Sequence, residues 1–196
     1  MALPKEYVTP ELRAIMDKLT QGSEEELGRL LPLTPEDLRV FGGLIQLYCF
    51  FDFNLRRAIE FFHHAGLLER KSMKKYPDFY DSELCDLVAS IVSKMDPDQE
   101  NVSEAMRRLG LVNGGRLYRN LVGHFSARRY PGRDIYVFLS KSDRDARQVF
   151  GDTLGKEHAH IGVAVCQDIA NLVKDLATHD EWLGLRIPHW HARYMG

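Results

Sequence analysis

The sequence predicts an all-α protein, a helical bundle with one short β-hairpin or lone strand near residues 130–139. Apolar residues recur at the three- and four-residue spacing of amphipathic helices along most of the chain. Capping and turn residues separate these periodic segments from one another. The run from Ile135 to Leu139 has β propensity and follows the turn Pro131-Gly132, but it is too short for a sheet protein.

The first 34 residues predict two short helices. One runs from Pro10 to Thr20, and a second begins at Ser23. The hydroxyl of Ser23 and the carboxylate of Glu26 have the spacing of a capping box, in which each side chain binds the backbone N–H of the other residue. We expect residues 1–34 to form a helical appendage.

A long central helix is expected after this appendage and should end near Gly66. Thr34 can cap its start, and Pro35 suits the first helical position. Apolar residues recur throughout it, so we expect it to be the core helix. Asp52 lies among phenylalanines, and because an isolated buried charge is too costly, it must face solvent, an interface or a polar partner.

Further helices are predicted towards the C-terminus. They run from Asp81 or Ser82 to Met95, from Asn101 to Leu109, from Arg116 after a turn at 113–115, from Ser142 with Asp145 to Phe150, and from Lys156 to Thr178. We expect the bundle to occupy residues 35–178. Residues 179–196 form an aromatic, basic tail, which we expect to pack as an arm.

Composition and charge limit the function. At 196 residues, with 44% apolar and 28% charged residues, the chain suits one compact soluble domain. Its net charge of -2 excludes a histone-like protein that is basic throughout. The N-terminus has no secretory signal pattern, and the longest apolar run, Val40–Phe53, is too short to span a bilayer. We therefore expect no membrane partner.

The cysteines and histidines were weighed as ligands and nucleophiles. Cys49, Cys85 and Cys166 are widely spaced among apolar residues, which indicates reduced core thiols in a cytoplasmic protein, with a catalytic thiol as the alternative. The histidine pairs at 158–160 and 189–191 lack the spacing and the cysteine ligands of a zinc site. Nucleotide-binding glycine loops are also absent, so we expect neither a metal nor a cofactor.

The segment from Ala105 to Arg133 is strongly basic. It contains no Asp or Glu. Seven arginines fall within it: Arg107, Arg108, Arg116, Arg119, Arg128, Arg129 and Arg133. Such a local positive field attracts an anion, and a phosphate is the anion that it fits best.

Arg119, Asn120 and His124 form a motif inside this segment. On a helix Asn120 and His124 share one face, while Arg119 lies about 140° from His124 and reaches the same anion through its long side chain. These residue types match the needs of RNA cleavage. A neutral imidazole takes a proton from a ribose 2′-hydroxyl, an imidazolium protonates the departing oxygen, and an arginine stabilises the charge on the phosphoryl group.

The Arg119-Asn120-x-x-x-His124 pattern resembles the signature of HEPN domains, and the central helix around Asp52 resembles their first core helix. The resemblance covers residues 35–178. It implies a HEPN-like helical bundle that forms a homodimer, and a metal-independent endoribonuclease whose cleft combines the motifs of two copies. Arg119 and His124 would then be catalytic, and Asn120 would orient them.

The resemblance also implies further roles and partners. Arg116, Arg128 and Arg129 would hold substrate phosphates, and Asp52 would match an acidic position that faces the active site. The implied partners are RNA, a second copy of the chain, and an antitoxin or regulatory protein in a defence, stress-response or toxin–antitoxin context.

Two alternatives stay open. The first is a non-catalytic HEPN-like module that binds RNA, a nucleotide or a protein. The second is a structural helical protein in which Arg119 is tied to a carboxylate and His124 is buried.

Overall fold

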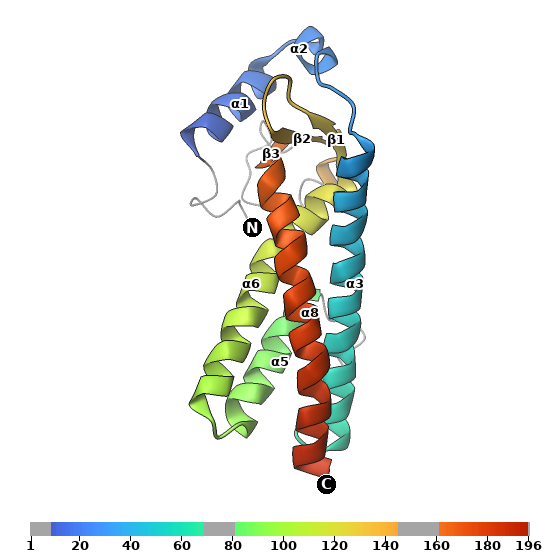
Figure 1. Ribbon diagram of the computed structural model, residues 1–196. Coiled ribbons are helices and arrows are strands. Elements are labelled where there is room, and N and C mark those ends of the chain that lie inside the picture. The colour runs from blue at the N-terminus through green and yellow to red at the C-terminus, as the bar shows by residue number, and fades with distance from the viewer. Residues whose placement is uncertain (1–8, 69–80, 145–160, 196) are drawn as a thin grey trace. The chain divides into compact units, whose positions relative to one another are not determined.

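The computed structural model describes residues 9–68, 81–144 and 161–195, which form six helices and three strands (Figure 1). The helices are α1 (Pro10–Gln21), α2 (Glu24–Gly28), α3 (Pro35–His64), α5 (Asp81–Met95), α6 (Gln99–His124) and α8 (Cys166–Met195). The strands β1 (Ser126–Arg129), β2 (Ile135–Leu139) and β3 (Ile161–Val165) form one antiparallel sheet in the order β1-β2-β3. The predicted mostly helical class with a short hairpin is confirmed, since β1 and β2 pair as neighbours.

Two compact units divide the chain. The first, here named the sheet unit, comprises residues 1–45 and 117–173, and the second, the helical unit, comprises residues 46–116 and 174–196. Each boundary falls within a helix, so α3, α6 and α8 contribute residues to both units. Within the described residues, no helix combines the length and the apolarity that crossing a membrane requires.

The sheet is covered on both of its faces. On one face α1 packs on the strands, and the buried residues of this cluster are Leu12, Ile15, Leu19, Leu30, Ile135, Val137 and Val163. On the other face Phe41 of α3 contacts Tyr136 and Phe138, with ring centroids 4.8 Å and 5.9 Å away. Successive strand residues point to opposite faces, so burial of both faces explains the uninterrupted apolar run of β2.

The outer edge of β1 is closed by the segment between α2 and α3. The N–H of Leu31 donates to the carbonyl of Arg129 at 2.9 Å, and the N–H of Arg129 donates to the carbonyl of Leu31 at 2.9 Å. This reciprocal pair of hydrogen bonds adds Leu31 to the sheet, on the side of β1 that does not pair with β2.

One capping box was predicted at the wrong place. Ser23 precedes α2 as expected, but its hydroxyl makes no capping hydrogen bond, and Glu26 pairs with Lys18 of α1 at 3.2 Å. A capping box is present at the start of α3. The hydroxyl of Thr34 accepts a hydrogen bond from the N–H of Asp37 at 3.2 Å, and the carboxylate of Asp37 accepts one from the N–H of Thr34 at 2.7 Å.

The segment Ile161–Val165 is a strand, although a helix from Lys156 was predicted there. A helix was predicted because the apolar residues Ile161 and Val165 have the four-residue spacing of a helix face. The β-branched residues of the segment fit equally well in a strand that is buried on both faces, and this is the structure they form. A Cβ at Gly162 would lie 2.9 Å from Cδ2 of Leu121, so glycine lets α6 pack closely on the sheet. Residues 145–150 and 156–160 of the predicted helices lie outside the described residues.

α6 is one continuous helix through Asn113-Gly114-Gly115, where a turn was predicted. Each of the two glycines destabilises the helix by about 1 kcal/mol relative to Ala. Tertiary contacts outweigh this cost. Leu109 and Val112 are buried just before the glycines. The hydroxyl of Tyr48 also donates to the carbonyl of Val112 at 2.9 Å and holds this part of α6 against α3 in the helical unit.

α8 continues through residues 179–195, where a tail packing as an arm was predicted. Leu183, Ile187 and Trp190 recur at the spacing of a helix face and are buried in the helical unit. Their burial stabilises the helix across Pro188, whose ring removes one backbone hydrogen bond.

Candidate functional site

The predicted motif occupies the last turns of α6. Leu117, Leu121 and Phe125 recur every four residues and are buried, so they anchor this end of the helix in the sheet unit. Arg119 and His124 lie between these anchors and are half-buried. α6 ends at His124, and β1 begins two residues later. The motif therefore stands at a helix-to-strand junction and remains accessible to a ligand.

The structure brings two motif side chains into contact. Nη1 of Arg119 donates to the side-chain oxygen of Asn120 at 3.1 Å, while the Nε of Arg119 is buried with no hydrogen-bond partner. Asn120 and His124 lie one turn apart on α6. No described residue hydrogen-bonds the His124 ring. The imidazole of His124 thus keeps both of its nitrogens available for a ligand.

The expected positive field of residues 105–133 is largely neutralised by carboxylates. Five arginines of the segment form ion pairs: Arg107 and Arg108 with Glu104, Arg116 with Asp52, Arg129 with Asp37 and Asp134, and Arg133 with Glu11. The expectation of an open basic field was wrong because most of these carboxylates lie in other segments of the sequence. Among the described residues, only Arg119 and Arg128 of the seven have no carboxylate partner.

Arg116 and Asp52 form a buried ion pair in the helical unit. Nη1 of Arg116 donates to Oδ2 of Asp52 at 3.0 Å, and Nη2 donates to Oδ1. Burial disfavours the charged guanidinium, but the hydrogen bonds and the charge of Asp52 outweigh this effect and raise the pKa of Arg116. The polar partner that Asp52 needed is Arg116. Because the guanidinium is directed at Asp52, we no longer propose that either residue binds substrate.

Arg129 is likewise held by a carboxylate, here in the sheet unit. Asp37 is 1% exposed and accepts hydrogen bonds from Nε and Nη2 of Arg129 at 2.8 Å and 2.6 Å. The hydroxyl of Tyr136 donates to the same carboxylate at 2.6 Å. Hydrogen bonds from Arg129 hold the pKa of Asp37 well below its ordinary value, against the opposing effect of burial. Arg129 therefore ties β1 to α3, and we no longer propose that it holds a phosphate.

Asp37 was missed as an organising residue by the sequence reasoning. Its local signal is the spacing Thr34-x-x-Asp37 ahead of an apolar helix, which is a capping-box pattern. The pairing with Arg129 has no local signal, since the two residues are 92 positions apart.

Arg128 is the exposed arginine of β1. It pairs across the sheet with Val137, and the side chain projects from the face opposite to that of Arg129. Of the predicted phosphate-binding residues, Arg128 alone keeps an uncompensated charge among the described residues.

The three cysteines differ in exposure. Cys85 and Cys166 are buried, as expected of core thiols, but Cys49 is exposed on α3. Burial raises the pKa of Cys85 to about 11 and that of Cys166 to about 12. These two thiols are poor nucleophiles, because the thiolate is the reactive form. Among the described residues, no group of three potential ligands lies close enough together to hold a metal ion.

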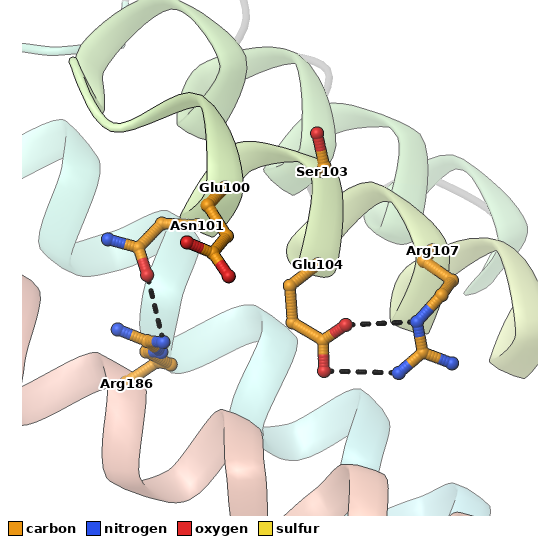
Figure 2. Close-up of a pocket in the computed structure, with 6 residues that line it drawn as sticks. All are labelled: Glu100, Asn101, Ser103, Glu104, Arg107 and Arg186. Carbon is orange, nitrogen blue, oxygen red and sulfur yellow. Dashed lines mark hydrogen bonds and ion pairs between the residues drawn. The ribbon is translucent and has the colours of Figure 1, made fainter.

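A hollow of about 370 Å³ in the helical unit is lined by none of the predicted catalytic or phosphate-binding residues (Figure 2). Arg107 forms two hydrogen bonds with Glu104, at 2.9 Å and 3.1 Å, and Arg186 donates to Asn101 at 3.1 Å. Figure 2 shows Glu104 and Arg107 paired along α6, and Arg186 of α8 directed at Asn101 of α6. Four of the six lining side chains are thus engaged with one another.

The resemblance to HEPN domains stays a prediction made from the motif and the central helix. No family model matches the chain, and neither a curated protein nor a solved structure is significantly similar to it.

Proposed function

We propose that this protein is a metal-independent endoribonuclease of HEPN type, with Arg119, Asn120 and His124 at a site shared by two copies. The observation that carries the proposal is the selective neutralisation of the basic segment. The two arginines without carboxylate partners among the described residues, Arg119 and Arg128, lie on either side of His124 in the sequence. Uncompensated cations within five residues of an accessible imidazole in the sequence fit a phosphodiester substrate.

The proposed reaction uses His124 as a proton carrier. A neutral imidazole accepts the proton of a ribose 2′-hydroxyl, and the 2′-oxygen forms a bond to the adjacent phosphorus. The bond from phosphorus to the 5′-oxygen breaks, and that oxygen takes a proton from an imidazolium. The products are a 2′,3′-cyclic phosphate and a 5′-hydroxyl. Arg119 stabilises the charge on the phosphoryl oxygens, and Asn120 positions Arg119 through the hydrogen bond at 3.1 Å.

This chemistry requires a second copy. The base and the acid act on opposite sides of the phosphorus, whereas the motif supplies one imidazole per chain. A two-fold pairing places two identical motifs in one cleft, so one His124 can serve as base and the other as acid. The cytoplasm is part of the same proposal, because the three cysteines are free thiols.

Replacing His124 by Ala tests the proposal. Native protein is expected to cleave single-stranded RNA in EDTA, and the variant should be slower by roughly 10²–10⁴-fold, the usual contribution of a proton-transfer group. Cleavage is followed on denaturing gels, and the products are checked for cyclic phosphate ends. His189→Ala is the matched control, because His189 is exposed on α8 and outside the motif.

Three results would overturn the assignment. They are undiminished cutting by His124→Ala, cutting that requires a metal, and cutting of an all-deoxy strand, which has no 2′-hydroxyl. RNA that is bound but left intact by native protein would favour the non-catalytic binding module instead.

A further inference from the structure

His179 is a buried histidine of the helical unit. It lies on α8 and is 8% exposed. Its Nδ1 is 3.1 Å from Nη1 of Arg108, which lies on α6 in the same unit. A guanidinium has five N–H donors and no acceptor, so Nδ1 must be the acceptor of this hydrogen bond. The contact therefore requires a neutral ring whose proton is on Nε2.

Arg108 contacts a second side chain of α8 as well. Its guanidinium lies over the ring of Trp182, 5.4 Å from the ring centre. The Nε1 of Trp182 is buried and has no hydrogen-bond partner among the described residues. On α6 itself, Nε of Arg108 donates to Glu104. Arg108 thus joins α6 to α8 through one imidazole and one indole.

The surroundings of His179 oppose its protonation. Burial has the largest effect and holds the pKa of His179 below its ordinary value, and the positive charges of Arg108 and Arg107 act in the same direction. Glu104 acts in the opposite direction, but both arginines already engage its carboxylate. On the side of α6, the ring therefore faces more positive than negative charge.

The carboxylates near His179 on α8 do not pair with it. Asp175 lies one turn earlier, and its charge favours an imidazolium. Asp180 follows His179 directly and accepts a hydrogen bond at 2.8 Å from the uncharged amide of Asn54 on α3. In the part of the chain that the structure describes, the ring of His179 hydrogen-bonds Arg108 alone. An imidazolium at this position would have no acceptor in place.

We propose that the contact between Arg108 and His179 is a pH-sensitive switch within the helical unit, in which protonation of His179 releases Arg108 and exposes Trp182. Protonation would place two cations 3.1 Å apart in a site that is largely shielded from water, so they separate. Glu104 retains the released guanidinium on α6, and water reaches the Nε1 of Trp182. The residues of this switch lie outside the motif at residues 119–124, so the inference does not depend on the proposed function.

Trp182 reports the release in the native protein. Acrylamide quenching of tryptophan fluorescence, followed from about pH 8 to pH 5, should increase as His179 gains its proton. The ratio of released to bound Arg108 should rise tenfold for each unit by which the pH falls, as for the titration of one group. Trp190 is 2% exposed and stays protected while the fold, followed by circular dichroism, is intact. Quenching that does not change over this range would overturn the proposal.

His179→Gln removes the titrating group and keeps an acceptor, because the amide oxygen can take the hydrogen bond from Arg108. The pH dependence of quenching should disappear in this variant. His189→Gln is the matched control, since His189 is exposed on the same helix, and it should behave as the native protein does. A folded His179→Gln variant that keeps the native pH dependence would contradict the switch.

Nuclear magnetic resonance of the native protein tests the geometry without a variant at His179. Long-range proton–nitrogen spectra at about pH 8 should show Nε2 of His179 protonated and Nδ1 bare, and a proton on Nδ1 would overturn the inference. Arg108→Gln should move the midpoint of the His179 titration to higher pH. Arg107→Gln is its control, because Arg107 shares Glu104 but does not hydrogen-bond the ring, and it should move the midpoint less. Equal shifts in the two variants would contradict the proposed role of Arg108.

Discussion

Asp37 is a residue of the sheet unit on which polar contacts from three elements converge. Its carboxylate accepts five hydrogen bonds, from the N–H and hydroxyl of Thr34, from two nitrogens of Arg129, and from the hydroxyl of Tyr136. These donors come from the start of α3, from β1 and from β2. One buried side chain thus joins a helix cap to two strands.

Asp37→Asn is expected to destabilise the protein by roughly 2–4 kcal/mol. The amide carries no charge and turns one donor towards Arg129, so a buried ion pair is broken while its cation remains. The free energy of unfolding in urea measures the effect. Asp134→Asn is the control, because Asp134 contacts the same arginine at 3.4 Å but is 61% exposed. Its loss should change stability by less than about 1 kcal/mol.

The ionisation of Asp37 also predicts how the free energy of unfolding depends on pH. The pKa of Asp37 is lower in the folded than in the unfolded chain, so the folded state binds fewer protons. The stabilisation is fully present above the unfolded value of about 4 and declines as the pH falls below it. Native protein should lose unfolding free energy below about pH 4, and Asp37→Asn should lose less. Equal losses in both proteins would contradict this role for Asp37.

At the scale of elements, strand β3 depends on a close approach by α6. Gly162→Ala places a methyl group 2.9 Å from Cδ2 of Leu121, a side chain that is fully buried. We expect a destabilisation of about 1–3 kcal/mol, as for other overpacked cores. Gly110→Ala is the control, because its added Cβ has open space inside α6 and should stabilise the helix by up to about 1 kcal/mol. Thermal unfolding of both variants checks the opposite signs.

The predictability of the elements follows from where their determinants lie. α3 was predicted because Thr34 and Pro35 mark its start locally. β3 was missed because strand pairing with β2 depends on a segment more than 20 residues away. α6 was split at its glycines because the burial of Val112 is a tertiary effect. Local caps and periodicity are visible in the sequence, whereas pairing and burial depend on distant segments.

The same distinction applies to the candidate site. Arg119, Asn120 and His124 are close in the sequence, and their shared helix follows from local periodicity. The carboxylate partners of the neighbouring arginines do not follow from local periodicity, since Asp52 is 64 residues from Arg116. The sequence therefore located the motif but overstated the charge around it.

At the scale of the whole molecule, the total charge is nearly balanced, and most arginines of the basic segment are paired with carboxylates from outside it. The net charge is -2, and the two arginines of the segment without carboxylate partners among the described residues give four such cations in a dimer. For single strands the logarithm of affinity falls by about 0.7 per neutralised phosphate for each tenfold rise in salt. We expect a slope near -3 for RNA binding, measured by fluorescence anisotropy at several salt concentrations.

Arg128→Ala should make this slope shallower by about 1.4, because each dimer loses two cations. Arg39→Ala is the control, since Arg39 is exposed but already paired with Glu36. A slope several times steeper than -3 would show that arginines placed here in ion pairs with Asp37 or Asp52 bind the RNA instead.

The two backbone hydrogen bonds between Leu31 and Arg129 affect how readily the chain can aggregate in concentrated solution. An edge strand with unpaired amides is a template on which other chains can add strands and aggregate. At β1 one such position is already taken by the chain's own segment ahead of α3. The segment between α2 and α3 therefore blocks part of an edge where intermolecular β-pairing would otherwise begin.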